Sequence, residues 1–139
     1  MKHIWIIGAG RFGQKAISAM KERYPESAIT VVDHCSKACE AISEPGITTI
    51  CMDGVSYLNH YLTDADEPGW VIPVIPVHLV YEWIRVRLLP DISIAPVEIP
   101  ENIRKSLPNV FSGNSGEIFV SNASFVCPDN CSEPQDLCT

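Results

Sequence analysis

The chain has 139 residues, enough for one compact domain with a short appendage, and 46% of them are apolar. This composition supports a hydrophobic core and excludes global disorder. The formal net charge of −7 argues against a nucleic-acid partner, because proteins that bind nucleic acids normally display a basic stripe.

The first half of the chain alternates strand-like and helix-like patterns. Residues 4–7 form a short apolar run that ends at glycine, which predicts a strand buried on both faces. Apolar residues then recur every four positions over 12–20, which predicts a helix that Pro25 ends. The β-branched residues at 28–32 predict a second strand that runs into Asp33.

The alternation continues with four further expected elements. They are a short helix at 36–43, a strand at 47–51, a weaker helix at 55–62 and a strand at 70–72. We expect Pro73 to lie beyond the fourth strand, because proline has no backbone N–H to donate.

A further helix is expected after the fourth strand, with Pro76 in its first turn. One apolar face of this helix is expected to carry Val77, Val80, Ile84 and Leu88. Residues 92–95 are expected to form a fifth strand. Strands that alternate with helices predict an α/β, Rossmann-type doubly wound fold, with a mainly parallel sheet covered by helices on both faces.

The pattern changes after residue 95. Prolines and a Ser/Gly-rich stretch predict loops and turns, with short strands at 117–120 and 124–127. We therefore divide the chain into a dinucleotide-binding domain at 1–95 and an irregular, cysteine-containing C-terminal extension at 96–139.

The strongest functional signal is the glycine pattern formed by Gly8, Gly10 and Gly13. It follows a predicted strand, opens a predicted helix and is followed about 20 residues later by Asp33, as the dinucleotide-binding fingerprint requires. Gly8 permits a tight turn, Gly10 lets the backbone approach a pyrophosphate, and Gly13 lets the helix pack closely on the strand. The diphosphate is expected at the N-terminus of that helix.

The choice of dinucleotide depends on Asp33, which ends the second predicted strand. Its carboxylate can accept hydrogen bonds from the ribose hydroxyls of the adenosine and would repel a 2′-phosphate. The next residues, 34–36, include no arginine that could pair with such a phosphate. NAD(H) is therefore favoured over NADP(H).

The residues at these motifs resemble a known family. They are Ile6-Ile7-Gly8-Ala9-Gly10-Arg11-Phe12-Gly13, Val31-Val32-Asp33 and Cys51-Met52-Asp53-Gly54. Over roughly residues 3–95, this chain is similar to the NAD-binding N-terminal domain of TrkA-type potassium-uptake regulators, a domain type also found in dehydrogenases. The resemblance implies that the glycine-loop residues, Phe12 included, contact the dinucleotide. It also implies that Arg11 lies beside the diphosphate and Asp53 near the adenine.

His78 is a candidate catalytic residue. It is expected in the first turn of the helix after the fourth strand, at the sheet edge where the nicotinamide would lie. A neutral imidazole there could exchange a proton during hydride transfer. The alternative is that His78 only packs or caps the start of the helix, and Glu82 one turn later is a weak candidate to orient it.

The cysteines suggest a second kind of chemistry. Cys127, Cys131 and Cys138 cluster near the end of the chain, where thiolates could bind zinc or an iron–sulfur cluster. Their spacing departs from the usual C-x2-C pair, so thiol redox chemistry and no function at all remain alternatives. Cys35 and Cys39 lie one helical turn apart beside Asp33, where they could also bind a metal or could be ordinary packing of small side chains.

Three functions follow from these observations. The first is an NAD(H)-binding regulatory module, the second a small NAD-dependent oxidoreductase that uses His78, and the third a metal-binding protein that uses the C-terminal cysteines. The absence of a recognisable catalytic pair favours the first. We see no signal peptide and no apolar run long enough to span a bilayer, so we expect a cytoplasmic protein, with a homodimer as an expected assembly.

Overall fold

The computed structural model describes residues 3–63, 67–89, 91–113 and 116–123. The chain forms two compact units, Met1–Ser93 and Ile94–Thr139. The first unit contains every residue of the glycine pattern together with Asp33, so it holds the candidate dinucleotide site.

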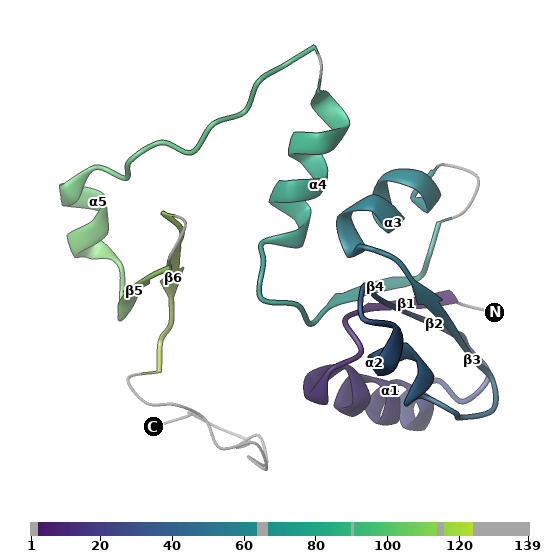
Figure 1. The fold of residues 1–139 in the computed structure, drawn as a ribbon. Helices are drawn as coiled ribbons and strands as arrows, with labels where there is room; N and C mark the ends of the chain where they lie inside the picture. Colours follow the sequence, from purple (N-terminus) through teal and green to yellow (C-terminus); the bar gives the residue numbers. More distant parts are fainter. Residues whose placement is uncertain (1–2, 64–66, 90, 114–115, 124–139) are drawn as a thin grey trace. The chain divides into compact units, whose positions relative to one another are not determined.

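A four-stranded parallel sheet forms the centre of the first unit. Its strands are β1 (His3–Ile7), β2 (Ala28–Asp33), β3 (Ile47–Cys51) and β4 (Trp70–Pro73). They lie side by side in the order β3-β2-β1-β4 (Figure 1). The strands β2 and β3 are added on one side of β1, and β4 is added on the other side. The order of the strands therefore reverses between β1 and β4, and ligands bind at such a switch point in open α/β sheets. The predicted α/β, Rossmann-type fold is confirmed.

Helices cover both faces of this sheet (Figure 1). One face carries α1 (Arg11–Arg23) and α2 (Ser36–Glu40), and the other carries α3 (Gly54–Tyr61) and α4 (Leu79–Leu88). Successive side chains of β1 alternate between the two faces. Ile4 and Ile6 are buried against the α1 side, whereas Trp5 and Ile7 are buried against the α3 side. This double burial explains why β1 is an uninterrupted apolar run.

Small differences separate the expected elements from the observed ones in this sheet. Helix α2 ends at Glu40, three residues before the expected end. Pro73 is the last residue of β4 and pairs with Ile7, contrary to the expectation that the strand stops before it. The proline is tolerated because the N–H of Val74 donates the hydrogen bond to Ile7 (2.9 Å), and β4 lies at the edge of the described sheet.

The predictions for α4 were wrong in two respects. The helix begins at Leu79, so Pro76 precedes it instead of lying in its first turn. The predicted apolar face is largely exposed, with Val80 at 61% exposure, whereas Leu79 is buried and Trp83 packs against the same core cluster. Leu79 and Trp83 have the same i, i+4 spacing as the predicted residues, so periodicity alone could not choose between the two faces.

The predicted fifth strand at 92–95 was also wrong, because this segment is irregular. The N–H of Ile92 donates to the carbonyl of Leu88, the last residue of α4 (2.9 Å), so Ile92 is bonded to the end of that helix. Ile94 already belongs to the second unit, so residues 92–95 join the two units and add no strand to the sheet.

The second unit contains α5 (Glu101–Ser106) and a hairpin of β5 (Val110–Ser112) and β6 (Ile118–Val120). The predicted strand at 117–120 is confirmed as β6, whereas α5 and β5 were not predicted. Asn109 has a positive φ of 41° and its side-chain amide donates to the carbonyl of Ser121 (3.0 Å). The predicted strand at 124–127 lies outside the described residues.

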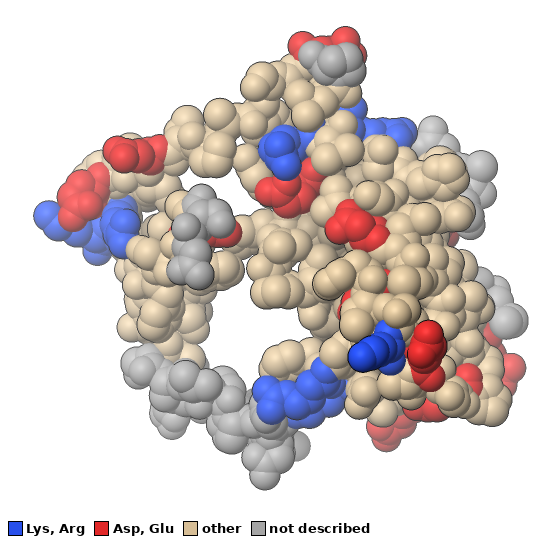
Figure 2. All heavy atoms as spheres, in the orientation of Figure 1, with Lys and Arg blue, Asp and Glu red and all other residues tan. Residues whose placement is uncertain are grey.

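The surface charge is mixed in the part of the chain that the structure describes. Figure 2 shows Lys and Arg in small separate groups on this face, interspersed with Asp and Glu. Within the described ranges, every helix is too short or too polar to cross a bilayer.

Candidate functional site

The loop between β1 and α1 depends on glycine at two positions. Gly8 has a φ of +120°, a region that favours glycine, and a Cβ there would lie 2.9 Å from the carbonyl oxygen of Val74. At Gly13, inside α1, a Cβ would overlap the carbonyl oxygen of Gly8. Both glycines therefore bring the helix and the loop after β4 close to the end of β1.

Gly10 differs from these two glycines because it faces open space. It is the N-cap of α1, and a Cβ added there would meet no atom within 4 Å. The first intrahelical hydrogen bond runs from the N–H of Gln14 to the carbonyl of Gly10 (3.0 Å). The preceding N–H groups at the start of a helix have no intrahelical acceptor and can bind an anion. Gly10 thus leaves room for a ligand over the start of α1.

Basic side chains surround the start of α1. The guanidinium carbon of Arg11 lies 5.2 Å from the ring centroid of Phe12, and Nζ of Lys15 lies 5.9 Å from it. The Phe12 ring is 55% exposed, and the first turn of the helix carries no acidic residue. These charges add to the positive end of the helix dipole, so the site favours a negatively charged ligand.

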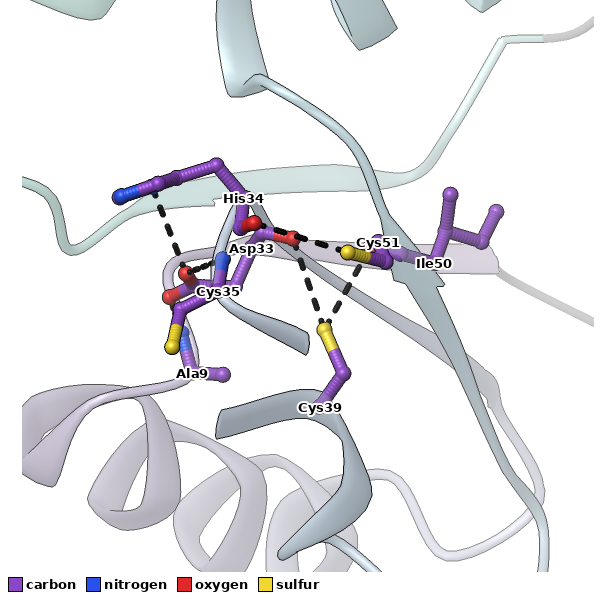
Figure 3. A network of polar contacts seen from close by, with 7 residues as sticks. All are labelled: Ala9, Asp33, His34, Cys35, Cys39, Ile50 and Cys51. Atoms are coloured by element: carbon purple, nitrogen blue, oxygen red, sulfur yellow. Dashed lines mark hydrogen bonds and ion pairs between the residues drawn. The ribbon is translucent and has the colours of Figure 1, made fainter. Parts of the chain in front are cut away.

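Asp33 connects the end of β2 to the glycine loop (Figure 3). Its Oδ2 accepts a hydrogen bond from the N–H of Ala9 (2.7 Å), and its Oδ1 accepts one from the N–H of Cys35 (2.8 Å). The side chain is 13% exposed, and Nδ1 of His34 lies 3.5 Å from Oδ1. The carboxylate is therefore fixed beside the loop and stays partly exposed.

Asp53 lies in the loop that follows β3. Its Oδ1 accepts a hydrogen bond from the N–H of Ser56 (2.8 Å), so the side chain is the N-cap of α3. The loop is connected to Asp33, because the N–H of Met52 donates to the carbonyl of Asp33 (3.0 Å). Asp53 thus lies at the same sheet edge as Asp33, where its side chain caps α3.

His78 is exposed and lies immediately before α4, as its N-cap, instead of in its first turn. Its side chain does not cap the helix, and the acid one turn later, Glu82, is bound to Arg85 (2.7 Å). His78 lines an open apolar pocket of about 550 Å³, together with residues from β4, the following loop and α4. Ile75 also lines the pocket, and a Cβ added at Gly8 would lie 3.0 Å from Cγ2 of Ile75. The pocket therefore adjoins the glycine loop.

A comparison with protein families gives a match for the part of the chain that holds this site. Residues 4–59, from β1 into α3, match the model of the TrkA-N domain. These residues form a TrkA-N domain. The match contains the glycine loop, Asp33 and Asp53, and a TrkA-N domain implies a nucleotide-binding regulatory module.

The remainder of the chain carries less functional information. Residues 80–139 match a second family model, described as the C-terminal domain of an uncharacterized protein. This match begins inside α4, so β4 and the loop before α4 lie between the two matched regions. No curated protein matches the sequence.

Sequence reasoning missed one close contact in the TrkA-N domain. A Cβ at Gly54, the first residue of α3, would overlap Cγ2 of Ile7 on β1. Gly54 thus lets α3 approach the sheet on the face opposite α1. The available signal was a glycine directly after an N-cap aspartate, but only the structure shows which strand lies against it.

The structure gives no support to a metal site in the described part of the chain. Among the described residues, no three His, Cys, Asp or Glu side chains come together in a way that could hold a metal ion. This includes the thiols of Cys35, Cys39 and Cys51, which are free. The predicted metal ligands Cys127, Cys131 and Cys138 lie outside the described residues.

Proposed function

We propose that the TrkA-N domain of this protein binds NAD(H) in preference to NADP(H) and acts as a dinucleotide-sensing module. The observation that carries this proposal is the position of Asp33. Asp33 ends β2, and its carboxylate bonds to the backbone of the glycine loop at Ala9 and is partly exposed. A ribose held there would have its diphosphate over the start of α1.

The glycine loop fits the diphosphate of such a ligand. Gly10 leaves the space above the helix N-terminus open, and the N–H groups of the first turn point into that space. Arg11 and Lys15 add positive charge beside it. A diphosphate needs both features, because its negative charge has to be matched as it leaves water.

The hydrogen-bonding capacity of Asp33 fits the ribose. An ionised carboxylate has about four lone-pair sites. The N–H groups of Ala9 and Cys35 each occupy one of them, which leaves sites for ribose hydroxyls. A 2′-phosphate would instead place negative charge beside this carboxylate, and no arginine follows it at residues 34–36. The preference for NAD(H) follows from this repulsion.

The pocket beside His78 supports a second candidate function, a small NAD-dependent oxidoreductase. Bound NAD would supply the hydride acceptor, and His78 would hold or release a proton at its imidazole. The regulatory function is favoured because a TrkA-N domain, which residues 4–59 match, implies a nucleotide-binding regulatory module. The enzyme hypothesis requires that His78→Ala abolishes turnover of a substrate while NADH binding is unchanged.

The experiment that tests the proposal is calorimetric titration of the full chain with NADH, NAD+ and NADPH. We expect NADH and NAD+ to bind and NADPH to bind at least about tenfold more weakly. Asp33→Asn should weaken NADH binding by about tenfold or more, since a charge-assisted hydrogen bond contributes roughly 1.5–3 kcal/mol. It should also reduce the discrimination against NADPH.

Glu101→Gln is the matched control, because it removes one negative charge from an exposed acid in the second unit. It should leave all three affinities unchanged. Circular dichroism of each variant verifies that the fold is retained. The proposal is wrong if the wild-type protein binds no dinucleotide, or if it binds NADPH as tightly as NADH.

A further inference from the structure

Three thiols surround the end of β2 beside Asp33 (Figure 3). Cys39 on α2 is buried, whereas Cys35 and Cys51 are exposed. Sγ of Cys39 donates weak hydrogen bonds to the carbonyls of Asp33 (3.5 Å) and Ile50 (3.7 Å). Sγ of Cys51 donates to the carbonyl of His34 (3.5 Å).

These contacts bring Cys39 and Cys51 close to each other. Cys51 pairs with Asp33 in the register of β2 and β3, and the sulfurs of Cys39 and Cys51 bond to the carbonyls of the consecutive residues Asp33 and His34. Ile50, the second acceptor for Cys39, directly precedes Cys51 in β3. The two thiols thus approach the same piece of backbone, one from α2 and the other from β3.

The electrostatics agree with this proximity. Burial raises the pKa of the Cys39 thiol above its ordinary value, and the charge of Cys51 is the next largest cause of the rise. Cys35 is the weakest of the contributing groups to the pKa of Cys39. Cys51 is therefore the thiol that acts most strongly on Cys39.

Packing accounts for only one of the two thiols. Cys39 is 6% exposed and fills a gap between α2 and the sheet, as a small apolar residue would. Cys51 is exposed, so core packing does not require a thiol there. An exposed thiol beside a buried one has the arrangement of an attacking and a resolving cysteine.

We propose that Cys39 and Cys51 form a redox-active pair, a modification site at which a peroxide closes an intramolecular disulfide next to Asp33. Exposed Cys51 reacts first. The oxidant is hydrogen peroxide: the Cys51 thiol loses its proton, its thiolate attacks one peroxide oxygen, the O–O bond breaks, and the departing hydroxide takes up a proton as water, which leaves a Cys51 sulfenic acid.

Cys39 then resolves the sulfenic acid. Its sulfur attacks the sulfur of Cys51, an S–S bond forms, the S–O bond breaks, and the departing hydroxide takes up the thiol proton of Cys39 as water. In total, two thiols and one peroxide give one disulfide and two waters. The two sulfurs lose two electrons, which the peroxide gains.

Closing this bond would change the surroundings of Asp33. It removes the S–H donors that now bond to the carbonyls of Asp33 and His34, and it ties α2 to β3. The N–H of Cys35, at the start of α2, is one of the two backbone donors to the Asp33 carboxylate. Oxidation should therefore weaken dinucleotide binding, a consequence that rests on the proposed function.

The test begins with the reduced 139-residue chain, which is treated with hydrogen peroxide and then alkylated. Trypsin cannot separate the two cysteines, because no Lys or Arg stands between residues 39 and 51. Cleavage after Glu40 separates them. We expect a mass loss of about 2 Da from two thiols and a disulfide-linked peptide pair that contains Cys39 and Cys51.

Two variants control this experiment. Cys35→Ser, which changes an exposed neighbouring thiol, should form the same linked pair. Cys51→Ser changes an exposed residue and should abolish the linked peptide pair. In this variant, we expect Cys39 to carry no stable sulfenic or sulfinic acid. The proposal is overturned if Cys51 pairs with Cys35, with a C-terminal cysteine or with a second chain, or if it oxidises further without forming a disulfide.

NADH titration of the reduced and oxidised forms separates this inference from the proposed function. We expect oxidation to weaken NADH binding by about fivefold or more, the lower limit of ordinary coupling between sites, and to have no such effect in Cys51→Ser. Equal affinity of the two forms overturns the coupling to Asp33. If the disulfide forms but reduced protein binds no NADH, the proposed function fails and the thiol pair stands.

Discussion

Replacing Gly13 by alanine should destabilise the fold through one backbone contact. The added Cβ would overlap the carbonyl oxygen of Gly8 and lie 3.0 Å from its carbonyl carbon. Both atoms belong to a loop that is itself fixed, because the N–H of Gly8 donates to the carbonyl of Val32 (2.7 Å). No side chain can rotate to relieve the overlap, so α1 has to move away from the sheet.

The expected loss of stability follows from two opposing effects. Overpacking a tightly packed site costs about 1–3 kcal/mol, and contact with rigid backbone places Gly13→Ala near the upper limit. Alanine is favoured over glycine inside a helix by roughly 0.5–1 kcal/mol. The net destabilisation is about 2 kcal/mol. For a unit of this size, that lowers Tm by roughly 8–16 °C, measured by far-UV circular dichroism during heating.

Gly10→Ala is the matched control. A Cβ at Gly10 meets no atom within 4 Å, so the variant should lose at most about 1 kcal/mol, through a weaker N-cap. It should nevertheless lose dinucleotide affinity, because the methyl group occupies the space above the helix N-terminus. The reasoning is refuted if Gly13→Ala is as stable as Gly10→Ala.

Three other predictions concern stability. Asp53→Ala removes the N-cap of α3 and should cost about 1 kcal/mol in urea unfolding, whereas Asp53→Ser should retain most of it. Leu79→Ala should cost roughly 2–5 kcal/mol, and Val80→Ala, on the exposed face of α4, less than about 0.5 kcal/mol; equal costs would contradict the observed orientation of α4. Because burial raises the pKa of Cys39, the folded state holds this thiol proton more tightly than the unfolded state. The ionisation of Cys39 should therefore leave the free energy of unfolding unchanged below the ordinary thiol pKa of about 8.5 and lower it as the pH rises above that value. In Cys39→Ser, the free energy of unfolding should fall less steeply with pH.

The sheet and the glycine loop could be predicted because their signals are local. Each buried strand is a short apolar or β-branched run, and Gly8 and Gly13 lie where the chain leaves one strand for a helix. The distance from the glycines to Asp33 also follows from the length of one β-α-β unit. The sequence does not show that the carboxylate of Asp33 bonds to Ala9, because that contact depends on how two strand ends meet.

The rest of the structure depends on packing that short patterns do not encode. On α4, the predicted residues and the pair Leu79 and Trp83 have the same helical spacing, and only the position of α3 decides which face is buried. Helix α5 has six residues and buries none, so it lacks an apolar stripe. Strand β5 has three residues, too few to show an alternating pattern.

The contact between Gly54 and Ile7 has a consequence for how related sequences can diverge. The atom that excludes a side chain at position 54 is Cγ2 of Ile7, which belongs to the β-branch of isoleucine. A change to leucine at position 7 moves the branch one carbon outward and frees that space. In relatives with this fold, we expect a residue larger than glycine at position 54 to be accompanied by loss of the β-branch at position 7. The two positions should therefore covary, although 46 intervening residues separate them in the chain.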